Sequence, residues 1–240
     1  MSEAGIPGAT RAPGPTVMQV ARGREDIVVG DELVRHKFSS RVIHWTVAVF
    51  FLGALFTGMP IWSPVFAWMA SFFGGLSVCR WLHAWLGVAF AAASLVMLVH
   101  WLGVMKFDAH DKKFRVLDYM KFSNATEDPE VGKYNAGQKF FFWAAALGAL
   151  ALLLSGIVLW WNAEFGQGLR AASIVLHDIA FIFFFVAIVG HIYLGTAAEP
   201  GTFRSMTRGT VTKSWARLHH PRWYREVTGN SSGLGAKERR

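Results

Sequence analysis

One stretch of sequence limits the possible folds of this chain more than any other. Residues 171–196 read AASIVLHDIAFIFFFVAIVGHIYLGT. The stretch is long and apolar enough for a single helix to cross a bilayer. It contains two histidines, His177 and His191. Because an ionisable side chain is costly inside hydrocarbon, each of them is a candidate functional residue.

The spacing of these two histidines places both on one face of a helix. Fourteen residues separate them, and a helix rises about 21 Å over that length while the two side chains stay within about 40° of each other. One helix therefore presents two imidazoles on the same side, one near each membrane surface. A stacked pair of haems needs this geometry. The alternative from this helix alone is two unrelated histidines, each hydrogen-bonded to a neighbouring helix.

The composition indicates a membrane protein and excludes several kinds of site. The chain is 53% hydrophobic and only 17% charged, which is typical of proteins with several spanning helices. The net charge of +8 comes from basic residues that flank the apolar segments, so it indicates membrane orientation and not nucleic-acid binding. The single cysteine, Cys79, excludes an intrachain disulfide framework, and no C-x-x-C-H motif for covalent haem occurs.

Four apolar segments predict four membrane-spanning helices. The expected spans are about 42–59, 81–105, 139–161 and 172–196. Because proline cannot continue the helical hydrogen-bond ladder, we expect Pro60 to end the first span. The apolar stretch 61–79 is interrupted by Ser, Pro and Gly-Gly. Its longest apolar run is too short to span, so we expect an interfacial or re-entrant piece there.

The distribution of lysine and arginine predicts the orientation of these spans. The two short connections offer only Arg80 and Arg170, whereas the loop 106–138 and the two termini hold nearly all other basic residues. The positive-inside rule then places both termini and the long loop in the cytoplasm. The predicted fold is an all-α, integral membrane four-helix bundle, N-in and C-in, with short interfacial helices.

The two ends of the chain differ in composition from its centre. Residues 1–34 are rich in Gly, Pro, Ala and mixed charges and lack an apolar core. We therefore expect a disordered cytoplasmic arm there and no secretory signal. Residues 227–240 are expected to form a disordered tail. The remaining residues, 35–226, are expected to form one transmembrane domain with a cytoplasmic tail.

The predicted topology sorts four histidines into two layers. Span one begins inside, so His44 lies near the inner surface together with His191. Spans two and four begin outside, so His83 and His177 form an outer pair. Two imidazoles suit a haem iron, and we interpret the four histidines as metal ligands of two b-type haems. His100 competes for the inner level, but it lies roughly 260° around the helix from His83.

Two arginines precede the proposed ligands. Arg41 comes three residues before His44, and Arg80 three residues before His83. Each arginine therefore lies on the same side of its helix as the histidine, nearer the membrane surface. Both are candidates to bind haem propionates through charge-assisted hydrogen bonds. Ordinary anchoring at the membrane interface explains them equally well.

These residues, together with two longer runs, resemble the cytochrome b (gamma) subunit of bacterial respiratory formate dehydrogenase. The motifs are Arg41-x-x-His44-Trp45, Arg80-x-x-His83, the pair His177 and His191, VGKYNAGQK at 131–139 and HHPRWY at 219–224. The resemblance covers roughly residues 35–226. The last two runs are the specific ones, because the four-helix histidine pattern is shared more widely.

The resemblance implies the electron-transfer subunit of an oxidoreductase complex in the bacterial inner membrane, surrounded by lipid. An iron–sulfur (beta) subunit would deliver electrons, and a molybdenum or tungsten catalytic (alpha) subunit would oxidise formate. Two haem b groups would then carry the electrons across the bilayer to a quinone near the cytoplasmic side. In this family plan, His83 and His177 match the ligands of the outer haem, and His44 and His191 those of the inner haem.

The resemblance also implies where the quinone binds. The matching loop positions are Asn135, Gly137 and Gln138, with Lys133 and Tyr134 as adjacent candidates. Amide groups of Asn and Gln can donate or accept hydrogen bonds at a quinone carbonyl. The alternative for this loop is a turn followed by a helix cap.

Three other functions fit parts of the pattern. The cytochrome b subunit of a nickel–iron hydrogenase or a related respiratory reductase shares the four-helix, two-haem plan. A transporter with a histidine relay would need more intramembrane carboxylates than Asp178. A diiron membrane enzyme needs closely spaced histidines at one surface, which two layers about 20 Å apart do not provide.

Overall fold

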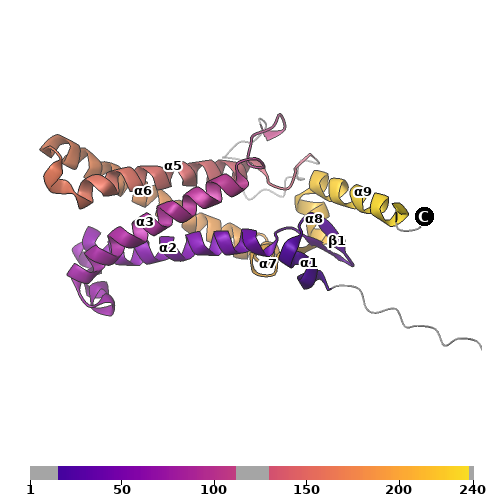
Figure 1. Ribbon diagram of the computed structural model, residues 1–240, viewed down its shortest axis with the longest axis horizontal. Helices are drawn as coiled ribbons and strands as arrows, with labels where there is room; N and C mark the ends of the chain where they lie inside the picture. The colour runs from indigo at the N-terminus through magenta and orange to yellow at the C-terminus, as the bar shows by residue number, and fades with distance from the viewer. Residues whose placement is uncertain (1–15, 112–129, 238–240) are drawn as a thin grey trace, which may run out of the picture.

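The structure is a computed structural model that describes residues 16–111 and 130–237, with side chains described as far as residue 229. The arm expected over residues 1–34 and the tail expected over 227–240 therefore lie partly outside the described residues. Within them, a long helical bundle carries a small folded region at one end (Figure 1). We call that region the cap.

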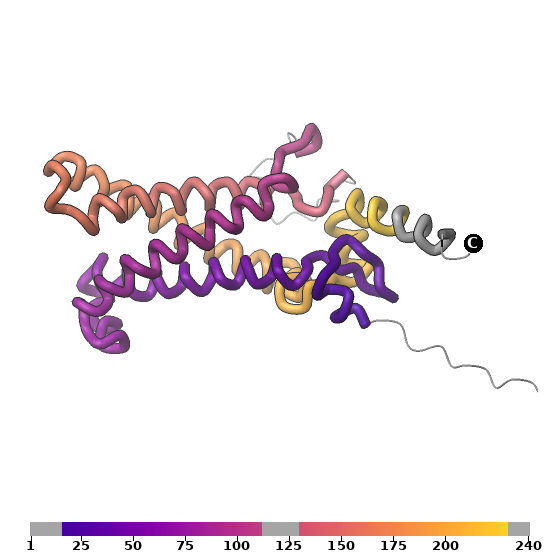
Figure 2. The backbone as a smooth tube through the Cα atoms, in the orientation of Figure 1, coloured from indigo at the N-terminus to yellow at the C-terminus, as the bar shows by residue number. Residues whose placement is uncertain are grey.

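Four long helices form the bundle. They are α2 (Phe38–Trp62), α3 (Leu76–Trp101), α5 (Ala136–Trp160) and α6 (Gln167–Tyr193). The short π-helix η4 (Leu194–Ala198) continues α6. All four are long and apolar enough to cross a membrane, which confirms the predicted all-α membrane bundle. In Figure 2, α3 crosses obliquely from the side of α2 to the side of α5.

The first span ends later than its proline predicts. Pro60 lies inside α2, which continues to Trp62, where the N–H of Ser63 donates to the Met59 carbonyl. A proline in the last turn removes one ladder hydrogen bond, and the helix has only two residues left to complete. Ser63 then caps the 3₁₀ helix η1 (Pro64–Phe73). This short apolar helix lies between the first two spans, where we expected an interfacial or re-entrant piece.

A cluster of aromatic side chains fills the centre of the bundle. Each of the four helices contributes one buried residue: Phe51, Phe90, Ala149 and Phe184. The three phenyl rings contact one another with centroids 5.4 to 5.8 Å apart. A Cβ added at Gly148 would lie 2.6 Å from the Phe184 ring, so glycine makes room for this contact. The middle of the bundle is therefore closely packed and apolar.

The cap combines segments from both ends of the chain. Strands β1 (Ile27–Val29), β2 (Glu32–Val34) and β3 (Thr210–Thr212) form an antiparallel sheet in that order. Around the sheet lie the helices α1 (Val17–Gly23), α7 (Thr202–Thr207), α8 (Lys213–His219) and α9 (Pro221–Lys237). Its core consists of Leu33, Val211, Trp215, Ala216, Trp223 and Val227. Figure 1 shows the cap at one end of the bundle.

In the structure, the described part of the expected arm forms α1, β1 and β2, and residues 227–237 of the expected tail lie in α9. Leu33 in β2 pairs with Val211 in β3, so the partner of this strand lies nearly the whole chain away. A strand of three residues is too short to leave a periodic pattern. The Gly- and Pro-rich residues before it dominate the average composition of the segment. These are the physical reasons why composition alone predicted a disordered arm.

We expect Leu33→Ala to destabilise the cap. Leu33 is 0% exposed, and truncating a buried leucine typically lowers the free energy of unfolding by about 2–5 kcal/mol. Limited proteolysis of the full chain in detergent should cut the cap of the variant much faster, with the bundle protected. Met18→Ala, at a position 45% exposed on α1, serves as the control. Equal cleavage rates in Leu33→Ala and Met18→Ala would show that Leu33 is not needed for cap stability.

Candidate functional site

The outer histidine pair lies toward the end of the bundle away from the cap. His83 on α3 and His177 on α6 have ring centroids 6.1 Å apart. A glycine faces each ring, and at Gly58 the absence of a side chain leaves the room that His83 needs. A Cβ added at Gly58 would lie 2.8 Å from Cε1 of His83, and one added at Gly156 would lie 3.5 Å from Cε1 of His177. His83 and His177, which the sequence analysis assigned to the same layer, therefore lie side by side.

Hydrogen bonds orient both rings of the outer pair. Nδ1 of His83 lies 2.9 Å from the carbonyl oxygen of Ala54, so this nitrogen carries the proton and donates. Nδ1 of His177 lies 2.9 Å from Oγ of Ser155. That hydroxyl donates to the Ala151 carbonyl at 2.6 Å, so it accepts from His177. In both rings Nε2 then keeps its lone pair, as in most metal-ligating histidines.

The inner pair joins α2 and α6 at the opposite level. His44 and His191 also have ring centroids 6.1 Å apart. Aromatic contacts hold these two rings: Phe141 stacks on His191 at 4.7 Å, and Trp45 meets the His44 ring at a right angle. Nδ1 of His44 is buried and has no hydrogen-bond partner among the described residues. The two pairs thus have the same spacing and different surroundings.

The spacing within each pair fits two imidazoles that share one metal ion. Imidazole–metal bonds are about 2.0–2.1 Å, and each ring centre lies about 1.1 Å beyond its nitrogen, so two rings that bind one ion from opposite sides have centroids about 6.3 Å apart. Both pairs match this value. Within residues 16–111 and 130–237, no three His, Cys, Asp or Glu side chains converge on one point. The pairs therefore suit an iron whose other ligands belong to a cofactor such as haem.

The aromatic cluster lies midway between the two pairs. Phe51 follows His44 by seven residues, and Phe90 follows His83 by seven. Phe184 is seven residues from both histidines of α6. Since seven residues are close to two helical turns, these phenyl rings recur on the histidine-bearing faces. An apolar layer therefore separates the two histidine levels.

The other residues expected near the histidine pairs have contacts of their own. Nε2 of His100 lies 2.9 Å from Oγ of Ser40, and its ring packs against Trp101, outside both pairs. Nη1 of Arg41 donates to the Thr207 carbonyl at 2.6 Å. Arg80 is exposed near the start of α3. Binding of haem propionates by Arg41 and Arg80 stays a prediction.

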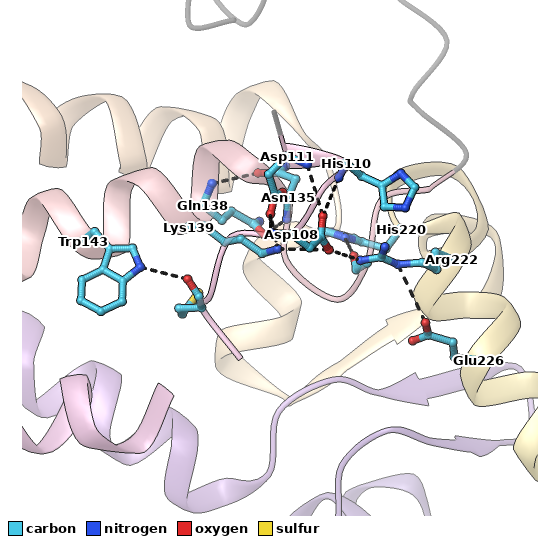
Figure 3. Close-up of polar contacts among 12 residues, drawn as sticks. Asp108, His110, Asp111, Asn135, Gln138, Lys139, Trp143, His220, Arg222 and Glu226 are labelled. Carbon is cyan, nitrogen blue, oxygen red and sulfur yellow. Dashed lines mark hydrogen bonds and ion pairs between the residues drawn. The ribbon is translucent and has the colours of Figure 1, made fainter. Parts of the chain in front are cut away.

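The predicted quinone loop, residues 131–138, enters α5 through a capping box. The Asn135 side-chain oxygen accepts from the Gln138 N–H at 2.8 Å, and Oε1 of Gln138 accepts from the Asn135 N–H at 3.1 Å (Figure 3). The helix cap that the sequence allowed is therefore present. Both amide oxygens are used within it, so a ligand at Asn135, Gly137 or Gln138 would meet the amide NH₂ groups and the backbone.

Lys133 and Tyr134 in this loop are held by other segments. Nζ of Lys133 pairs with Asp26 at 3.0 Å and with Glu25 at 3.3 Å, both in the cap. The Tyr134 hydroxyl accepts from Nε1 of Trp101 at 2.7 Å, and burial raises the pKa of this phenol. These contacts explain how the cap and α3 fix the loop, and they make both residues structural neighbours of the candidate site.

An ion cluster beside the loop was not predicted from the sequence. Lys139 is only 5% exposed, and its ammonium lies 2.6 Å from Asp111 and 3.7 Å from Asp108. Arg222 of the tail pairs with Asp108 at 2.7 Å (Figure 3). This bond holds the pKa of Asp108 well below its usual range. The charged residues of this cluster come from three segments that are far apart in the sequence. No spacing or motif in the sequence indicates that they lie close together.

Comparisons with known proteins agree with this geometry. Residues 35–209 match the family described as prokaryotic cytochrome b561. The nitrate-inducible formate dehydrogenase cytochrome b556(Fdn) subunit of Escherichia coli is 32% identical over 203 residues, which cover 81% of this chain and 91% of that subunit. The formate dehydrogenase cytochrome b556(fdo) subunit of the same species is 33% identical, covering 82% and 94%.

A third relative extends the similarity to another organism. The formate dehydrogenase cytochrome b556 subunit of Haemophilus influenzae is 32% identical over 200 residues, which cover 81% of this chain and 83% of that subunit. The predicted resemblance to formate dehydrogenase cytochrome b subunits is thereby confirmed. With its four apolar helices, this multi-pass membrane protein belongs to the prokaryotic cytochrome b561 family.

Proposed function

We propose that this chain is the membrane-anchor cytochrome b subunit of a formate dehydrogenase complex, and that it passes electrons through two b haems to quinone. The observation that carries the proposal is the presence of two histidine pairs in one bundle, each with centroids 6.1 Å apart. The named relatives favour formate dehydrogenase over the hydrogenase alternative. Formate oxidation itself belongs to another chain of the complex.

The residues of this chain would hold the cofactors and exclude water from the space around them. His83 and His177 would bind the outer haem, and His44 and His191 the inner haem. A b-type haem supplies a reversible one-electron couple. Ala54 and Ser155 keep Nε2 of the outer rings available as the ligating nitrogen. The phenylalanine layer excludes water between the two levels, so charge crosses the bundle as electrons.

The distribution of basic residues supports an inward direction of electron flow. The cap and the α3–α5 loop carry many lysines and arginines, whereas Arg80 and Arg170 are the basic residues nearest the opposite end. The positive-inside rule places the cap in the cytoplasm. An iron–sulfur subunit would then dock at the outer end, near His83 and His177. Quinone reduced at the inner end would take its protons from the cytoplasm, which builds a membrane potential without a proton pump.

The position of the loop 131–138 supports a quinone site beside the inner pair. Gln138 and Phe141 are three residues apart on α5, so they share one face of the helix. Phe141 stacks on His191 at 4.7 Å. The Gln138 amide therefore belongs to the helix face that meets the inner pair. Asn135, Gly137 and Gln138 are the proposed contacts of the quinone head group.

We expect His83→Ala to remove the outer haem and to retain the inner one. The variant loses one of two axial ligands, while His44 and His191 are unchanged. The absorbance of reduced b-type haem per chain should fall by about half. His100→Ala is the matched control, because this imidazole hydrogen-bonds to Ser40 outside both pairs. Full haem content in His83→Ala, or haem loss in His100→Ala, would contradict the assignment.

We expect Gln138→Glu to slow haem oxidation by quinone without loss of haem. Glutamate at this position preserves the capping box, but it replaces the amide NH₂ donor by a second acceptor. Asn135→Asp makes the same exchange at the other cap residue. Rapid mixing of pre-reduced complex with quinone should give reoxidation about tenfold slower, equivalent to one lost hydrogen bond of about 1.4 kcal/mol. Wild-type rates in both variants would limit the two residues to helix capping.

A further inference from the structure

Arg35 is a buried cation in the cap. It is 2% exposed, and it lies directly after β2, where its backbone N–H donates to the Gly209 carbonyl at 2.8 Å. Burial lowers the pKa of the guanidinium to about 10, so the group stays charged at neutral pH. A buried charge is stable only when hydrogen-bond acceptors or other favourable contacts replace water. The contacts of Arg35 therefore show which groups compensate its buried charge.

Three aromatic rings from different segments surround the guanidinium. Its central carbon lies 4.9 Å from the ring of Trp215, 5.8 Å from that of Trp223 and 5.8 Å from that of Tyr134. The rings belong to α8, α9 and the quinone loop. Such contacts favour a cation over neutral groups and limit how a planar guanidinium can turn. The three rings thus limit the directions in which the Arg35 guanidinium can donate hydrogen bonds.

The hydrogen bonds of Arg35 are directed at the quinone loop. Nη2 donates to the Lys133 carbonyl at 2.7 Å and to Oε1 of Gln138 at 3.5 Å. No carboxylate of the described residues forms an ion pair with Arg35, and its Nε and Nη1 have no partner there. Asp26 and Glu199 favour the charged form of Arg35 electrostatically. The two hydrogen bonds from Nη2 connect the cap to the loop at Lys133 and Gln138.

The consequence for Gln138 is a defined orientation of its amide. Oε1 accepts from two donors, the Asn135 N–H at 3.1 Å and Nη2 of Arg35 at 3.5 Å. Because the amide group is planar, its oxygen faces Arg35 and its NH₂ faces the other way. Without Arg35, the capping box would hold the oxygen through a single hydrogen bond. The oxygen and nitrogen of the amide would then exchange places more easily.

We propose that Arg35 is a positioning residue of the quinone site, which holds Gln138 so that its amide NH₂ donates to a quinone carbonyl oxygen. This inference rests on the quinone site proposed above at residues 131–138. It extends that site to the N-terminal segment, because Arg35 reaches the loop from the position directly after β2 of the cap. Glu25 and Asp26 of the same segment reinforce the connection through Lys133.

A double-mutant cycle separates positioning from general support of the cap. The complex is purified with its partner chains, reduced, and mixed with increasing concentrations of ubiquinone-1, a short-chain benzoquinone. Arg35→Gln should raise the half-saturating quinone concentration about tenfold, which corresponds to about 1.4 kcal/mol. In a Gln138→Ala background, the same substitution should change it by less than about twofold, since coupled residues are not additive. Haem content should equal that of the wild type.

Two further variants make the cycle decisive. Arg204→Gln removes another cap arginine, which pairs with Glu32 and not with the loop, and should leave the quinone dependence unchanged. Arg35→Lys keeps the charge but loses the planar fork. It should give a smaller increase that also disappears with Gln138→Ala. If Arg35→Gln does not assemble, the cycle with Arg35→Lys decides by the same criterion.

The outcomes distinguish this inference from the proposed function. Equal effects of Arg35→Gln in both backgrounds would show that it acts independently of Gln138 and would overturn the positioning role. Loss of haem in both Arg35 variants would assign the residue to general stability and would also overturn it. No effect of Gln138→Ala itself would remove the loop from the quinone site, and the inference would fail together with that site.

Discussion

A histidine ring inside hydrocarbon has two polar nitrogens that are costly to bury without a partner, and the outer half of the bundle meets this requirement. In the outer pair, a backbone carbonyl and the Ser155 hydroxyl accept from the two Nδ1–H groups. Each Nε2 is left as an electron-pair donor without competition from a proton. Intramembrane histidines are candidate functional residues, and two facing pairs, each on two helices, suit the metal cofactors proposed above.

The same requirement explains the periodic pattern of the helices. Two histidines of α6 lie fourteen residues apart, and each of the phenylalanines Phe51, Phe90 and Phe184 comes seven residues from a histidine of its own helix. Glycines lie where a ring from a neighbouring helix needs space: Gly58 faces His83, and Gly148 faces Phe184. The two levels differ in their second contacts, since hydrogen bonds orient the outer rings and aromatic stacking orients His191. Hydrogen bonding at Nδ1 strengthens a ligating imidazole, so we expect the two pairs to differ in strength as the proposed ligands.

Much of the bundle followed from the sequence because its causes are local. Hydropathy marked the four spans, and the helical repeat together with membrane depth paired His44 with His191 and His83 with His177. The cap did not follow, because β2 consists of three residues whose partner, β3, lies at the other end of the chain. The cluster of Asp108, Asp111, Lys139 and Arg222 was missed for the same reason. Arg35 precedes the first span in the sequence, and only the fold brings Trp215, Trp223 and Gln138 to it.

The ratio of haem to protein is the most direct test of this arrangement. The complex is purified in mild detergent, haem b is extracted and quantified by its reduced absorption spectrum, and this chain is quantified by amino-acid analysis of its separated band. Two histidine pairs, each serving one iron, predict two haem b groups per chain. A ratio of one would mean that one pair has another purpose. A protein without haem would contradict the assignment of both pairs.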